Sequence, residues 1–233
     1  NTGTGTAHNT VNVGSQAPAM DGNVNSIAGK LIVNGESTGS SDTLNVDDSG
    51  DSADNTGTLT ATTLTGMGMG VGIEYSGIEY LNINMGTGAD TFNVQGTAAV
   101  TLTTVNTGTG SAANVINVGT KAPATNGNVN AIAGKLVLNG QSTSDTANVD
   151  DTGDALRNTG FLTSTRIWGL GMPDSTETLN GITYGTLEFL NINLGLGADT
   201  FNVRSAHAGQ TKVEGRDSDD TFNVGSQAPA LDG

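Results

Sequence analysis

The chain has 233 residues, of which 35 are glycine, 34% are hydrophobic and only 4% are aromatic. Eight Lys and Arg residues against 23 Asp and Glu residues give a formal net charge of −15. This acidity disfavours binding to nucleic acids and to anionic membranes, and no apolar run reaches the ~18 residues of a membrane-spanning helix. The absence of cysteine excludes disulfide bonds. The composition favours a thin core shared between repeating units.

Taken in chain order, the sequence contains two long repeats and the start of a third. Residues 12–35 match residues 117–140 at 17 of 24 positions, at an offset of 105. Residues 223–233 match residues 12–22 at 10 of 11 positions. We therefore expect one long repeat at 1–105, a second at 106–213 and the start of a third at 214–233, in a chain that continues on both sides.

Each long repeat contains about three shorter units, each made of a strand, a glycine-containing turn and a second strand that ends in Asn-Val. These units cover residues 30–46, 81–94, 103–118, 135–149, 190–203 and 211–224. In the strand that ends the 81–94 unit, Thr91 to Val94, alternation directs Phe92 and Val94 to one side and Thr91 and Asn93 to the other. Phe201 and Phe222 are expected to point inward in the same way. Stacking of equivalent strands predicts an all-β, right-handed parallel β-helix, or β-solenoid, with short coils and almost no helix.

Two longer segments interrupt the short units, at Thr56–Tyr80 and Thr159–Phe189. They contain strand-like stretches such as TLTATTLTG and IEYSGIEY, so we expect them to add strands to the solenoid. The second segment carries Trp168, the only tryptophan. Trp168 and Tyr184 are candidates for stacking on sugar rings, and the alternative is that they cover the side of a sheet.

Two turns carry the most specific motif. Residues 86–92 read Gly-Thr-Gly-Ala-Asp-Thr-Phe, and residues 195–201 read Gly-Leu-Gly-Ala-Asp-Thr-Phe. These turns resemble the calcium-binding nonapeptide of RTX, or haemolysin-type, proteins from its second glycine onward, and the repeat style of the whole chain resembles adhesin-like bacterial surface proteins. The resemblance implies Ca²⁺ ligands at Asp90 and Asp199 and at the turn carbonyls, with the glycines Gly86, Gly88, Gly195 and Gly197 in the turn.

The match departs from the nonapeptide pattern in two respects. Met85 and Leu194 replace its first glycine, and the two aspartates lie 109 residues apart instead of nine. In related copies Asp42 and Asp145 lack the two glycines, and Asn114 replaces the aspartate. The alternative interpretation is that these aspartates cap turns by accepting hydrogen bonds from backbone N–H groups.

A second acidic group follows the Asn-Val pairs. It comprises Asp47, Asp48, Asp51 and Asp54 in the first long repeat and Asp150, Asp151 and Asp154 in the second. Closely spaced carboxylates repel one another unless a cation or solvent intervenes. The group therefore predicts either a second Ca²⁺ site or a solvated acidic rim that discourages edge-to-edge pairing.

Catalysis has little support, because the only histidines are His8 and His207 and the basic residues are scattered. We expect a protein that is not an enzyme. The resemblance implies an extracellular or cell-surface location and a structural rod segment of a filament, sheath or giant surface protein, stabilised by Ca²⁺. Its partners would be neighbouring repeats or other copies, end to end. The alternative is an adhesin passage domain that binds a surface or carbohydrate ligand through its insertions.

Overall fold

The computed structural model describes residues 7–35 and 41–230, and every regular element in these residues is a β-strand. Ten strands form sheet A in the spatial order β1 (Thr10–Val13), β3 (Thr43–Asp47), β7 (Tyr80–Asn84), β9 (Leu102–Asn106), β11 (Leu136–Asn139), β15 (Ile182–Gly185), β14 (Arg166–Gly169), β13 (Thr159–Leu162), β17 (Thr200–Val203) and β19 (Thr221–Val224). Nine strands form sheet B in the order β18 (Gln210–Glu214), β16 (Phe189–Asn193), β12 (Thr146–Asp150), β10 (Val115–Val118), β8 (Thr91–Val94), β4 (Thr56–Leu59), β5 (Thr63–Gly66), β6 (Gly72–Ser76) and β2 (Lys30–Asn34).

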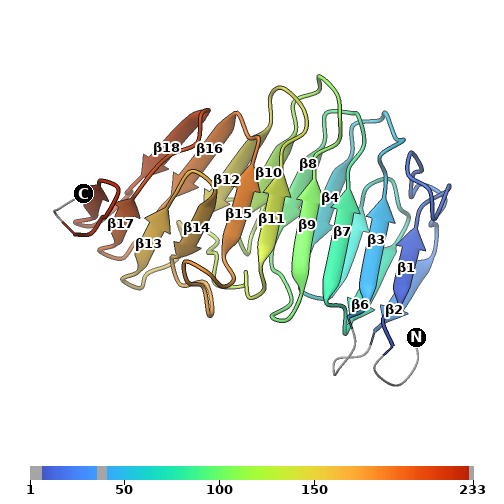
Figure 1. Cartoon of the computed structure of the whole chain (residues 1–233), viewed down its shortest axis with the longest axis horizontal. Helices are drawn as coiled ribbons and strands as arrows, with labels where there is room; N and C mark the ends of the chain where they lie inside the picture. The colour runs from blue at the N-terminus through green and yellow to red at the C-terminus, as the bar shows by residue number, and fades with distance from the viewer. Residues whose placement is uncertain (1–6, 36–40, 231–233) are drawn as a thin grey trace.

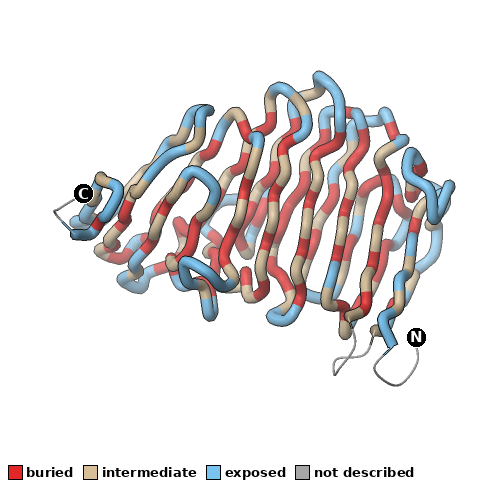
Figure 2. Tube along the Cα trace, viewed as in Figure 1, coloured by how far each residue is buried: buried red, intermediate tan, exposed pale blue. Residues whose placement is uncertain are grey.

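The chain passes back and forth between these two sheets and advances along both of them. Figure 1 shows the sheets as two layers, with the strands stacked along the long axis from the N-terminal to the C-terminal end. A single apolar core of Val, Leu and Ile side chains fills the space between the layers. Figure 2 shows buried residues recurring along the strands of both layers, with exposed residues gathered in the connections. The expected all-β class with a thin core is confirmed.

Alternation along the strands follows the sequence prediction in the interior of the sheets. Phe92, Val94 and Phe201 have 0% exposed surface. Neighbouring strands pair in parallel and in register, so that Phe92 aligns with Ile116 and Phe201 aligns with Phe222. Phe222 is nevertheless 45% exposed, which corrects the expectation that it is enclosed. The reason is its place in β19, the edge strand of sheet A.

Both insertions add strands, as predicted, and they do so as antiparallel excursions within one sheet. In the first long repeat β4, β5 and β6 lie side by side in sheet B, with antiparallel pairing on both sides of β5. In the second, β13, β14 and β15 do the same in sheet A. The outer strands of each excursion pair in parallel with β2 and β8, or with β11 and β17.

The two long repeats place equivalent strands in opposite sheets. Strand β1 lies in sheet A, its counterpart β10 lies in sheet B, and the next counterpart β19 lies in sheet A again. The first long repeat contributes β2, β6, β5, β4 and β8 to sheet B and only β1, β3, β7 and β9 to sheet A, and the second repeat reverses these roles. Both sheets therefore advance equally over two long repeats.

This switch also corrects the expected stacking of the Asn-Val strands. Asn12 aligns with Asn45, and Asn93 aligns with Asn117 and through it with Asn148. However, β3 and β8 belong to different sheets, so Asn45 does not stack on Asn93. Between these two asparagines the chain crosses from one sheet to the other an odd number of times. The number of residues between them does not predict how many crossings occur.

Strands β2 and β11 each end in an asparagine that is followed by a glycine, Gly35 or Gly140. Neither Gly35 nor Gly140 has a φ in the left-handed region. Instead, a Cβ at Gly35 would overlap the carbonyl oxygen of Gly77, so glycine is needed for a close backbone approach. Residues 36–40 of the 30–46 unit and the last three residues of the third copy lie outside the described residues. Within residues 7–35 and 41–230 we find no helix long and apolar enough to cross a membrane.

Candidate functional site

The two groups of candidate residues, separate in the sequence, lie against each other in the structure. The loop of residues 47–55 packs on the turn of residues 86–90, and residues 150–158 pack on residues 195–199. We call each combination an acidic turn pair. In the first pair, Thr87 N–H donates to the Asp51 carbonyl at 2.7 Å, and Ala89 N–H donates to Asp54 Oδ1 at 2.8 Å. In the second, Leu196 N–H donates to the Asp154 carbonyl at 2.6 Å.

The motif glycines make this packing possible. A Cβ at Gly86 would lie 2.5 Å from the Asp51 carbonyl oxygen, and a Cβ at Gly195 would lie 2.5 Å from the Asp154 carbonyl oxygen. A Cβ at Gly88 or Gly197 would overlap the carbonyl of Ala53 or Leu156. Glycine at these four positions lets one backbone lie directly on the next, which is a packing role.

Asp90 and Asp199 accept hydrogen bonds from the neighbouring acidic loop. Asp90 Oδ1 accepts from the backbone N–H of Asn55 at 2.8 Å, and Asp199 Oδ1 accepts from that of Asn158 at 2.7 Å. Both side chains are buried. These contacts are those of the capping interpretation, in which the carboxylate replaces water as the acceptor for a loop amide.

The carboxylates of each acidic loop also accept hydrogen bonds from backbone N–H groups of a second segment, the loop that follows β1 in the first long repeat and β10 in the second. Asp47 Oδ2 accepts from Gly22 N–H at 2.9 Å, and Asp48 Oδ1 accepts from Val24 N–H at 3.0 Å. The second repeat reproduces these contacts, since Asp150 binds Gly127 and Asp151 binds Val129. Asp51 and Asp154 accept from the backbone N–H groups of Ala53 and Leu156. They also accept from asparagine side-chain amides, those of Asn25 and Asn55 and of Asn130 and Asn158.

All six of these carboxylates are mostly buried, with Asp48 and Asp151 the most completely enclosed. These carboxylates therefore do not form the solvated acidic rim that was one of the two expectations. Burial raises the pKa of Asp48 to about 7, and repulsion from Asp51 and Asp90 adds to the effect. Burial likewise raises the pKa of Asp151 to about 8, with repulsion from Asp154 and Asp199. The N–H groups that these side chains accept from act in the opposite direction, too weakly to offset burial.

Three other carboxylates of the acidic turn pairs also have shifted pKa values. Burial also raises the pKa of Asp90 and of Asp199. The pKa of Asp51 is lowered, chiefly by the hydrogen bond from the backbone of Ala53. One oxygen of Asp90 and one of Asp151, Oδ2 in each case, is buried without a hydrogen-bond partner. Each acidic turn pair therefore contains a buried carboxylate oxygen that could accept a proton or contact a cation.

A calcium ion needs several oxygen ligands at one point. Among residues 7–35 and 41–230, no group of three or more His, Cys, Asp or Glu side chains is arranged around a common centre. An ion at an acidic turn pair would therefore have to complete its coordination with backbone carbonyls and water, around the unpartnered oxygen.

Asn114, which departs from the aspartate of the motif, has a role that sequence reasoning missed. Its Oδ1 accepts from Asp90 N–H at 2.9 Å, and its Nδ2 donates to Asp145 Oδ1 at 3.0 Å. Asp145 also accepts from Ser142 and Thr107, and these hydrogen bonds lower its pKa despite its burial. An amide accepts from one neighbour and donates to the other, which the ionised carboxylate of the motif could not do because it only accepts.

We therefore expect Asn114→Asp to destabilise the protein by roughly 2–4 kcal/mol at pH 7, because it replaces a buried donor with a second carboxylate facing Asp145. Urea unfolding measures this loss, and lowering the pH to about 4.5 should recover part of it by protonating the pair. The matched control is Asn126→Asp, an exposed position whose counterpart in the first repeat is already Asp21. Equal stability of the two variants at pH 7 would contradict the assigned role.

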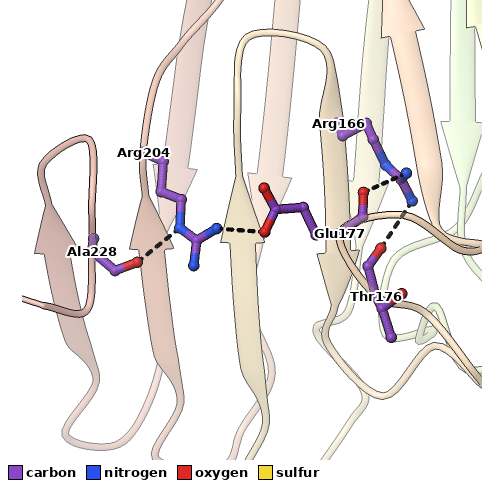
Figure 3. Close-up of polar contacts among 5 residues, drawn as sticks. All are labelled: Arg166, Thr176, Glu177, Arg204 and Ala228. Atoms are coloured by element: carbon purple, nitrogen blue, oxygen red, sulfur yellow. Dashed lines mark hydrogen bonds and ion pairs between the residues drawn. The ribbon is translucent and has the colours of Figure 1, made fainter.

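The second insertion carries a cationic and aromatic cluster with no equivalent in the first. Phe161 and Trp168 stack with ring centroids 5.0 Å apart, and the Arg204 guanidinium lies 5.0 Å from the Phe161 ring centre. Arg204 also forms an ion pair with Glu177 and donates to the Ala228 carbonyl, as Figure 3 shows. Arg166 donates to the carbonyls of Thr176 and Glu177 and so fastens the longer loop of this insertion.

The two aromatic candidates for sugar stacking are enclosed. Trp168 is 5% exposed and Tyr184 is 2% exposed. Tyr184 donates from its hydroxyl to the Thr163 carbonyl at 2.5 Å, and Tyr75 makes the same contact with Thr60 in the first repeat. Trp168 and Tyr184 therefore pack against the sheets, which is the alternative to sugar stacking.

Comparison with protein-family models, with curated proteins and with solved structures gave no match to this chain. The resemblance to RTX and adhesin-like proteins therefore depends on the two glycine-aspartate turns and on the style of the repeats. Of the two histidines, His8 is exposed, and His207 lies against the Tyr184 ring and contacts Thr211 through Nδ1.

Proposed function

We propose that this chain is a non-catalytic rod segment of an extracellular filament, sheath or giant surface protein, wound as a right-handed β-solenoid. The supporting observation is that strand stacking continues without interruption from one long repeat to the next. Strand β10 pairs in parallel with β8, and β11 with β9. Right-handedness is expected because parallel strands joined by crossovers adopt that hand in nearly all proteins. The extracellular setting rests on the family resemblance.

The ends of the stacks support an end-to-end arrangement. Strands β1 and β2 lie at one end of sheets A and B, and β19 and β18 lie at the other. Each is an edge strand, whose outer backbone N–H and C=O groups need partners. Phe222 and Val224 on β19 are 45% and 80% exposed. Neighbouring repeats, or another copy of the chain, would cover these edges and lengthen the rod.

The rod proposal predicts a fixed rise per repeat. Strands β1 and β19 are the two ends of a ten-stranded sheet and are separated by two long repeats, so nine spacings lie between them. At about 4.8 Å per spacing, two long repeats should lengthen the rod by about 43 Å. Small-angle scattering of chains with two, four and six long repeats should show this linear increase at constant cross-section. A cross-section that grows, or a flexible string of separate domains, would contradict the proposal.

Calcium is the ion that we propose at the acidic turn pairs. The unpartnered buried oxygens of Asp90 and Asp151, together with the mutual repulsion of the surrounding carboxylates, support a cation there. An oxygen-only surrounding favours Ca²⁺ over softer metals. Binding would replace repulsion by attraction and tie each acidic loop to the turn packed on it, which would stiffen the rod.

An adhesin passage domain is the second candidate, and the divergence of the insertions favours it. Thr58 and Thr65 pair across β4 and β5, where Phe161 and Trp168 pair across β13 and β14. The second insertion also has a longer loop, whose residues 176–179 are exposed. A ligand for this candidate would contact that loop, since the enclosed aromatic rings are inaccessible.

A further inference from the structure

Each long repeat forms a groove between a row of asparagines and an overhanging Ala-Pro-Ala loop. The first groove, about 300 Å³, lies over the outer face of sheet A. Its floor is made by asparagines of β1, β3, β7 and β9, and its wall by Pro18 and Met20. The second groove, about 220 Å³, lies over sheet B, with Asn117, Asn148 and Asn193 on the floor and Pro123 on the wall. The same local construction therefore recurs in two different settings.

The asparagine floor has hydrogen-bonding groups that the protein does not use up. Asn82 Nδ2 donates to Asn45 Oδ1 at 2.8 Å, and Asn45 Nδ2 donates to Asn12 Oδ1 at 2.8 Å. A second row runs parallel to the first, with Asn106 Nδ2 donating to Asn84 Oδ1 at 2.7 Å. A primary amide has two N–H donors and an oxygen with two lone pairs. The row uses one donor and one lone pair of Asn45, which leaves one of each.

The overhanging loop is held in place by its neighbours. Gly22 N–H and Gly127 N–H, at the end of each loop, bind the buried carboxylates of Asp47 and Asp150. Gln95 Nε2 donates to the Ala122 carbonyl at 2.7 Å, and Arg204 Nε donates to the equivalent Ala228 carbonyl of the third copy at 2.8 Å. The groove is therefore formed before any ligand arrives, which lowers the cost of binding.

The lining restricts the chemical class of the ligand. Neither groove is lined by Lys or Arg, so an anion would find no positive charge there. The only charged lining residues, Asp47 and Asp150, are 5% and 8% exposed and already accept backbone N–H groups. What remains is a regular array of neutral amides facing a small apolar wall. Vicinal hydroxyls match the amides, and the C–H face of a pyranose ring matches proline and methionine.

We propose that these two grooves are binding sites for neutral polysaccharide chains. They lie on opposite faces because the two long repeats place equivalent strands in opposite sheets. One rod therefore presents successive sites to different sides and links separate glycan chains, instead of lying along a single one. This site is distinct from the insertions and does not depend on whether the chain assembles into filaments.

The test uses the full 233-residue chain and neutral hexasaccharides of glucose, mannose, galactose and N-acetylglucosamine, followed through side-chain amide signals in NMR titrations. We expect at least one hexasaccharide, at up to about 10 mM, to shift the amide signals of Asn45 and Asn148 with two sites per chain. The double variant Asn84→Ala and Asn193→Ala should weaken this binding at least about tenfold. The control Asn139→Ala, in the same row as Asn106 but outside both grooves, should change it less than about twofold.

A second pair of changes guards against a folding defect in the asparagine variant. Ala19→Trp and Ala124→Trp, both at exposed loop positions, should fill the grooves and abolish the amide shifts while unfolding stays unchanged. No amide shifts with any of the four hexasaccharides would overturn the proposal. So would equal binding by wild type and both double variants, or equally tight binding of hexagalacturonate, which would show that the grooves do not select neutral chains.

Discussion

Gly197→Ala should destabilise the protein by roughly 2–4 kcal/mol, measured by urea unfolding in EGTA. A Cβ at this position would overlap the Leu156 carbonyl, and backbone atoms cannot move aside as a flexible side chain can. Two stacked segments would have to separate, and the loss would extend to the hydrogen bond between Asp199 and the Asn158 N–H. The size of the effect follows from packing alone, so it should appear with no metal present.

The matched control is Gly185→Ala. Gly185 also lies in the second repeat, a Cβ there would meet no atom within 4 Å, and its φ is outside the left-handed region. This change should leave stability within about 0.5 kcal/mol of the wild type or raise it, because alanine restricts the unfolded chain. If Gly197→Ala were as harmless as Gly185→Ala in EGTA and harmful only in calcium, the motif glycines would serve the ion and the packing role would be wrong.

The sequence predicted the structure best along buried strands, where apolar and polar residues alternate. The inward positions of Phe92 and Val94 follow from the two-residue strand period, and parallel, in-register pairing follows from the repeated Asn-Val pairs. The assignment of strands to sheets could not be predicted from the sequence. A connection of a given length can either cross to the other sheet or fold back within the same one. The exposure of Phe222 was missed for a related reason, since being at an edge is a property of the whole sheet.

The sequence predicted the glycine-aspartate turns and the acidic loops as two separate groups of residues, whereas in the structure they pack directly on each other. Asp51 and Thr87 lie 36 positions apart, and only stacking of the strands on either side brings the Thr87 N–H to the Asp51 carbonyl. Asn114 was missed because a motif comparison scores it as a lost carboxylate, although its amide satisfies two neighbours at once. The hydrogen bonds between outward asparagines depend on the register of neighbouring strands, which the sequence does not determine.

The pKa values of Asp48 and Asp151 predict an unusual dependence of stability on pH in EGTA. Both are raised, to about 7 and about 8, above the ordinary value of 3.8 that applies when the chain is unfolded. Between about pH 4 and pH 8 the folded state therefore holds more protons than the unfolded state, so the free energy of unfolding falls as pH rises through this window. Asp51 and Asp145 have lowered pKa values, and their contribution is lost only below about pH 4.

We therefore expect the melting temperature in EGTA to be highest near pH 5 and to fall by roughly 5–10 °C by pH 8.5. Asp48→Asn with Asp151→Asn keeps an acceptor for Val24 and Val129 but removes the titrating group, so it should flatten this decline. Asp217→Asn with Asp219→Asn, two exposed changes that remove the same number of carboxylates, should not. A wild-type melting temperature that rises from pH 5 to pH 8.5 in EGTA would show that these carboxylates are ionised in the folded protein.

Calcium acts on the same groups in the opposite direction, because it binds the ionised carboxylate and competes with the proton. With about 5 mM Ca²⁺ in place of EGTA, wild-type protein at pH 8.5 should recover most of the lost melting temperature, while at pH 5 the ion should have little effect. The Asp48→Asn, Asp151→Asn variant should not respond to calcium at either pH. If the wild type is equally indifferent at pH 8.5, the buried carboxylates hold protons and cap loops, and the calcium part of the proposed function falls while the rod remains.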